Sequence, residues 1–154
     1  MNVMAPTRPT ELHRYRVRLT TGPGASAEAR RQVRAAICGW EIPVDPDVAI
    51  LLTSELVTNA IRHEVTGIVT LAITCSCGQL RVDVYDTSRR LPMLVDASAD
   101  DEAGRGLMLV TTLSDEWGFY RTPAGKAVYF TLAFQPGVTE GNGRGPQGAH
   151  AWGL

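Results

Sequence analysis

Apolar and polar residues alternate in several short stretches of the chain, with the two-residue period of a β-strand. The first stretch is half exposed, because arginines fill its alternate positions. Short turns separate the later stretches, at Gly78 and around residues 123–125, which predicts two hairpins. The stretches that alternate in this way are residues 15–19, 68–75, 80–86, 117–121 and 127–134.

Apolar residues at helical spacing predict three helices between these strands. Ser26 is expected to cap a helix that runs to about Cys38. Asp45-Pro46 predicts the start of a second helix, because aspartate caps well and proline suits the first turn. That helix runs to about His63, and residues 107–113 predict the third.

Strands paired by short turns, with helices elsewhere, predict an α+β fold: a two-layer sandwich with helices on one face of a mostly antiparallel sheet. A chain of 154 residues suits one such domain with a single core. We expect a flexible leader over residues 1–10, the folded domain over residues 11–135, and a disordered tail rich in glycine over residues 136–154.

Charge and cysteine content narrow the cellular setting. The net charge is -1, which gives no electrostatic case for nucleic acid or a membrane surface as partner. No apolar run approaches the roughly 20 residues of a membrane span, and the polar N-terminus does not resemble a signal peptide. The three cysteines are then expected to be reduced thiols in a cytoplasm. Cys75 and Cys77 lack the further ligands of a typical zinc site, so buried or turn thiols are favoured.

Polar residues on the second predicted helix are the first candidates for chemistry. Glu55, Asn59 and His63 recur every four residues and form one stripe. A solvated helix face is the simple alternative. Threonine and asparagine are poor choices for such a face, which favours a functional stripe.

Two further segments point to a ligand. Asp86 keeps the inward parity of its strand, and a buried carboxylate needs a partner, such as the amino group of a purine. The alternative is an aspartate that starts a turn. The segment Gly104-Arg105-Gly106 precedes the third predicted helix, where backbone N–H groups can hold an anion. The long polar segment before it suggests a lid over phosphates.

Taken in order, these segments resemble the motifs of the GHKL ATPase and kinase superfamily, which has the Bergerat fold. Its N box is matched by Glu55-x3-Asn59, its G1 box by Asp86-Thr-Ser88-x3-Pro92, and its G2 box by Gly104-Arg105-Gly106-Leu107. Within the superfamily the chain is most similar to the small anti-sigma-factor serine kinases and their stand-alone bacterial relatives. The resemblance spans residues 12–134.

The resemblance implies ATP and Mg²⁺ as cofactors and gives the residues roles. Asn59 would ligate Mg²⁺, and Glu55 would act as general base toward a serine hydroxyl. Asp86 would accept a hydrogen bond from the adenine amino group, with Ser88 beside the base. Lys126 would either approach the nucleotide or remain a solvated turn lysine. The implied ATP-binding set is Asn59, Arg62, His63, Asp86, Ser88, Pro92, Gly104, Arg105, Gly106, Leu107 and Lys126.

Two positions depart from the superfamily pattern. Ser88 stands where the G1 box commonly has glycine, a change that the small kinase branch tolerates. Ala127 stands where many relatives carry a threonine beside adenine. The missing hydroxyl contact is worth about 1 kcal/mol, so a modest affinity is expected.

The implied function is a serine/threonine protein kinase that phosphorylates an antagonist protein and otherwise sequesters a sigma factor. The alternative is an ATP-binding regulatory module without phosphotransfer. A sensor histidine kinase would need a phosphoacceptor histidine on a dimerisation helix, which neither His13 nor His150 supplies. Gyrase-type and chaperone-type ATPases need large additional domains. Relatives often form a homodimer through the first strand and helix, which directs attention to Tyr15, Val17 and Leu19.

Overall fold

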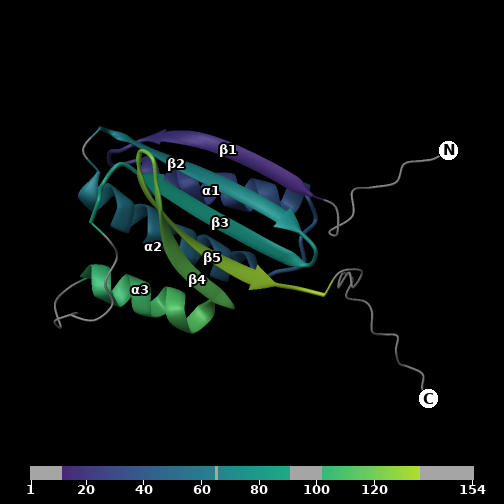
Figure 1. Cartoon of the computed structure of the whole chain (residues 1–154). Coiled ribbons are helices and arrows are strands. Elements are labelled where there is room, and N and C mark those ends of the chain that lie inside the picture. The colour runs from purple at the N-terminus through teal and green to yellow at the C-terminus, as the bar shows by residue number, and fades with distance from the viewer. Residues whose placement is uncertain (1–11, 65, 91–101, 136–154) are drawn as a thin grey trace, which may run out of the picture.

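The computed structural model describes residues 12–64, 66–90 and 102–135, without the side chains of His63 and of residues 102–105. Figure 1 shows one layer of strands with helices behind it. Along the chain, the elements are β1 (His13–Thr20), α1 (Ala25–Gly39), α2 (Pro46–His63), β2 (Ile68–Ser76), β3 (Gln79–Asp86), α3 (Glu102–Leu113), β4 (Glu116–Thr122) and β5 (Gly125–Ala133).

The five strands form one antiparallel sheet in the order β1-β2-β3-β5-β4. Helices α1 and α2 pack against each other and cover one face of the sheet, while α3 packs mainly on α2 (Figure 1). The predicted α+β sandwich is therefore confirmed. The opposite face of the sheet carries no helix of the described chain, and we call it the open face. No helix among the described residues is long and apolar enough to cross a membrane.

The core lies between the sheet and the helices. Alternate residues of β2, β3 and β5 point inward, including Leu71, Val82 and Phe130, and they are fully buried. Leu52 and Leu56 of α2 pack onto them from the helical layer. Every second residue of these strands is therefore buried, as the alternating stretches of the sequence predict.

The element boundaries confirm some sequence signals and correct others. Asp45 caps α2 as predicted, because its side chain accepts a hydrogen bond of 2.9 Å from the backbone N–H of Asp47. Ser26 does not cap α1. That helix begins at Ala25 after Gly24, without a side-chain cap, and the Ser26 hydroxyl lies 3.2 Å from that of Thr58 on α2.

Helix α3 also begins earlier than the sequence predicts. It starts at Glu102, so Gly104-Arg105-Gly106 lies inside its first turns and not before them. Gly106 is tolerated there because the helix lies directly against Glu55 of α2 at that position. The predicted lid segment falls mostly on residues 91–101, which lie outside the described residues.

Candidate functional site

Helix α2 brings Glu55 and Asn59 toward the first turns of α3. Asn59 is 7 % exposed, and its amide has no hydrogen-bond partner among the described residues. Gly106 of α3 lies directly against Glu55, because a Cβ at that position would fall on the Glu55 carboxylate. The predicted N box and G2 box are thus neighbours in space.

The helical position of Gly106 changes its expected role. In an α-helix the N–H groups of the first three residues have no partner within the helix, and here these are residues 102–104. The N–H of Gly106 is directed to the carbonyl of Glu102 by helix geometry. Gly106 therefore provides space for Glu55, and the N–H groups left free to meet an anion are those of residues 102–104. The roles predicted for the Arg105 side chain and for His63 lie outside the described residues.

Asp86 ends β3 with its side chain completely buried. Both carboxylate oxygens contact the ammonium of Lys126, at 2.9 Å for Oδ1 and 2.8 Å for Oδ2. Oδ1 also accepts a hydrogen bond of 2.8 Å from the backbone N–H of Ser88. A buried charge is tolerated only when it is paired and hydrogen-bonded, and this pair meets both conditions.

Lys126 is therefore not a solvated turn residue, and that alternative is wrong. It lies on β5 directly opposite Asp86 in the strand register, and only 1 % of its surface is exposed. The register also corrects the expectation for Ala127, which lies opposite Tyr85 on the open face. The residue of β5 beside Asp86 is a lysine, so the missing threonine hydroxyl is not the relevant departure.

The Asp86 carboxylate retains capacity for one more hydrogen bond. An ionised carboxylate offers about four acceptor sites. Lys126 and Ser88 occupy two on Oδ1, and Lys126 occupies one on Oδ2. The remaining site on Oδ2 suits one N–H of an amino group, such as that of adenine. Because the Asp86 side chain is 0 % exposed, a purine base could reach this acceptor only if the residues covering it moved.

A carboxylate that the motifs do not include fixes the neighbouring turn. Glu64 follows the last residue of α2, and its two oxygens accept hydrogen bonds of 2.8 Å each from the backbone N–H and the hydroxyl of Thr87. Burial alone would raise the pKa of Glu64. Hydrogen bonds from Thr66 and Thr87 outweigh it and lower that pKa to about 2. Glu64 thus ties the helix of Asn59 to the strand end of Asp86.

Close backbone contact supports the same turn from the other side. Gly125 begins β5, and a Cβ there would collide with the Asp86 carbonyl and the Thr87 backbone. Ser88 is 7 % exposed, and its hydroxyl accepts a hydrogen bond of 3.0 Å from the backbone N–H of Arg90. Its role is therefore to shape the turn after Asp86.

The other predicted residues contribute less to the described site. Leu107 is buried in the hydrophobic core. Arg62 is exposed on the last turn of α2 and is already engaged in an interaction. Pro92 lies outside the described residues. Glu64 was missed by the sequence analysis, and the only signal for it is a carboxylate directly after the predicted helix end.

The chain is similar to a known protein family. The family model for the histidine kinase-like ATPase domain matches residues 19–132. The match includes every element from α1 to β5 and the end of β1. A comparison with curated proteins finds no match to the chain.

Proposed function

The chain belongs to the histidine kinase-like ATPase domain family, and on that premise we propose that it is an ATP-dependent serine/threonine protein kinase. Its substrate would be an antagonist protein. In its unphosphorylated form, that antagonist would compete with a sigma factor for binding to the kinase. Family membership implies a nucleotide-binding regulatory function. The kinase activity is the further step, and it rests on the geometry of α2 and α3.

The observation that carries the proposal is the position of Glu55. Its carboxylate lies on α2 one helical turn before Asn59 and against Gly106 of α3. Bound ATP would supply the phosphoryl group, with Asn59 as a ligand of its Mg²⁺ and the first N–H groups of α3 beside its phosphates. Glu55 would then accept the proton of an attacking serine hydroxyl. In phosphoryl transfer, positioning of this kind is most of what the protein contributes.

The second candidate is a regulatory module that binds ATP without transferring phosphate. The Asp86–Lys126 pair favours it, because the Asp86 side chain is fully covered and has one acceptor site left for a base. The bound nucleotide would then serve to hold a protein conformation. A homodimer remains a proposal under either function, and its contact would have to keep the two rows of exposed β1 arginines apart.

The pocket itself is tested by calorimetric titration of ATP and ADP, with and without Mg²⁺. Asp86→Ala is a poor variant for this purpose, because it would leave Lys126 buried without a counter-charge. The double variant Asp86→Asn with Lys126→Met removes both charges and keeps the volume. We expect Mg²⁺-dependent ATP binding by the wild type and its loss in the double variant. Absence of binding by the folded wild type would reject both candidate functions.

Glu55→Gln distinguishes the two candidates. The variant keeps the shape of the side chain and removes the base, so ATP binding should persist while transfer to an antagonist protein is lost. Glu41→Gln is the matched control, because Glu41 is exposed after α1, outside the site. Transfer that Glu55→Gln leaves unchanged would reject Glu55 as base. A wild type that binds ATP but transfers no phosphate would favour the regulatory module.

A further inference from the structure

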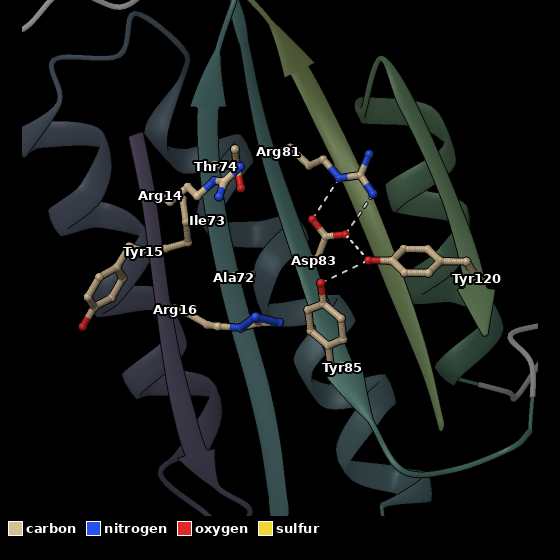
Figure 2. Close-up of a pocket in the computed structure, with 10 residues that line it drawn as sticks. All are labelled: Arg14, Tyr15, Arg16, Ala72, Ile73, Thr74, Arg81, Asp83, Tyr85 and Tyr120. Atoms are coloured by element: carbon tan, nitrogen blue, oxygen red, sulfur yellow. Dashed lines mark hydrogen bonds and ion pairs between the residues drawn. The ribbon is translucent and has the colours of Figure 1, made fainter. Parts of the chain in front are cut away.

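The open face of the sheet contains a groove that the nucleotide site does not use. Its floor is β2, whose residues on this face have short side chains: Thr70, Ala72 and Thr74. Arginines of β1 form one wall, and tyrosines of β3 and β4 form the other (Figure 2). The groove has a volume of about 520 Å³. A second hollow of about 780 Å³ continues it along Arg16 and Arg18 and ends at the turn of Asp86 and Thr87, next to the nucleotide site.

The β1 wall is a row of three arginines. Arg14, Arg16 and Arg18 are all exposed and share the open face, opposite Thr74, Ala72 and Thr70 of β2. In the described part of the chain none of them forms an ion pair. Residues two apart on a strand are separated by roughly 6.6 Å. The row therefore presents three unpaired positive charges at the spacing of alternate side chains in an extended chain.

The opposite wall is fixed by hydrogen bonds and carries no free negative charge. Asp83 is 5 % exposed, and both its oxygens accept hydrogen bonds of 2.9 Å from the Arg81 guanidinium. Tyr120 reaches across β5, so that its hydroxyl lies 2.9 Å from Asp83 and 3.1 Å from that of Tyr85 (Figure 2). Burial, and then the bond with Tyr85, raises the pKa of Tyr120, which keeps the hydroxyl protonated.

We propose that this groove binds an extended acidic segment of a partner protein, with acidic residues at alternate positions facing Arg14, Arg16 and Arg18. Charge complementarity selects the occupant, because opposite charges on neighbouring strands are favourable and like charges are not. β1 is also an edge strand that pairs only with β2 among the described residues. A segment in the groove lies over β2 and meets β1 through the arginine side chains, so the free main-chain edge of β1 is not part of this site.

A second copy of this chain fits the groove poorly. A twofold contact brings the same surface together from both molecules. Pairing β1 with its own copy would place two rows of arginines side by side on one face. Such a contact would bring like charges close together, whereas an acidic segment would neutralise them.

Single-stranded nucleic acid is also disfavoured, although tyrosines and arginines on an open sheet can bind it. Bases bind such surfaces by stacking on free aromatic rings. Here the Arg16 guanidinium lies 4.9 Å from the centre of the Tyr85 ring, and that of Arg81 lies 3.9 Å from the centre of the Tyr129 ring. Of the two tyrosines that form the groove wall, Tyr85 is therefore already covered by an arginine, and so is Tyr129 on the neighbouring strand β5.

The test is fluorescence anisotropy of a labelled octapeptide of alternating Glu and Thr, titrated with the full chain at low salt. The comparison probes are the same peptide with Gln for Glu and an eight-nucleotide oligothymidylate. The test variant is Arg14→Gln with Arg16→Gln and Arg18→Gln. Its control is Arg34→Gln, which removes one positive charge from the exposed side of α1. Thermal unfolding and ATP titration check that the triple variant keeps its fold.

We expect saturable binding of the acidic peptide that weakens with salt. The triple variant should bind it at least about tenfold more weakly, which corresponds to about 1.4 kcal/mol, while Arg34→Gln should not differ from the wild type. Failure of the acidic peptide to bind would overturn the proposal. So would equal binding by the triple variant or by the glutamine peptide. Tighter binding of the oligothymidylate would reject an acidic protein segment in favour of nucleic acid.

Discussion

Two aspartates of β3, three residues apart, show how differently the two faces of this sheet use the same side chain. Asp86 points toward the helices, where it and Lys126 are 0 % and 1 % exposed. Asp83 points to the open face, where it pairs with an Arg81 side chain that is 36 % exposed. Both carboxylates have a cationic partner at hydrogen-bonding distance, but only the first pair is isolated from water.

The comparison shows that environment, and not contact distance, sets what an ion pair contributes. Removing one partner of a buried pair leaves a charge that water cannot reach. Removing one partner of a pair near the surface leaves a charge that water and salt can still screen. The helix-covered face should therefore be intolerant of single changes, while the open face should absorb them and respond mainly in binding.

The largest expected effect is that of Lys126→Met. We expect the free energy of unfolding to fall by about 3–5 kcal/mol, because Asp86 stays buried without its counter-charge. Arg81→Met is the matched change on the open face, and about 1 kcal/mol is expected there. Urea unfolding measures both. Adding Asp86→Asn to Lys126→Met should recover most of the loss. Equal losses for Lys126→Met and Arg81→Met would contradict the difference between the two ion pairs.

Glu64→Gln should have a smaller effect that depends on pH. The pKa of Glu64 is lowered from 4.5 to about 2, so its ionised form is favoured by folding. The stabilisation is complete above the unfolded value of 4.5 and is lost as the pH falls through about 2. Because Glu64 is partly exposed, we expect only about 1 kcal/mol at pH 7. Unfolding curves of wild type and variant should converge near pH 2, and a constant difference would contradict this account.

Tyr120→Phe tests the network of the open face. The variant removes the hydroxyl that bonds Asp83 and lies beside Tyr85. Arg81 still holds both oxygens of Asp83, so we expect a loss of about 0.5–1 kcal/mol in unfolding free energy. ATP binding, measured by calorimetry, should not change. A weaker affinity for ATP would mean that the two faces are coupled.

Gly106→Ala should affect stability least and activity strongly. The new methyl group would meet the far end of the Glu55 side chain, which can move aside. Alanine also favours a helix over glycine by about 1 kcal/mol, so unfolding free energy should change little. Phosphotransfer should fall, because Glu55 is displaced. Gly39→Ala is the control, since a Cβ there meets no atom, and unimpaired transfer by Gly106→Ala would argue against a role for Glu55.

Most of the fold could be predicted from the sequence because its signals are local. The alternation in β2 and β3, the Asp45-Pro46 start of α2 and the hairpin at Gly78 each depend on neighbouring residues only. The start of α3 could not be predicted in the same way. Two glycines discourage a helix locally, and the close packing of α3 on α2 explains one of them, because Gly106 makes room for Glu55.

The sequence by itself determined the elements, the inward parity of Asp86 and the polar stripe of Glu55 and Asn59, since each follows from the period of a single helix or strand. Only the tertiary structure decided that Lys126, and not Ala127, is the neighbour of Asp86, because a shift of one residue in the register of two strands exchanges their faces. It likewise decided that Glu64 holds Thr87, since that contact joins elements 23 residues apart. Pairings between distant segments depend on how the sheet assembles, which no local pattern records.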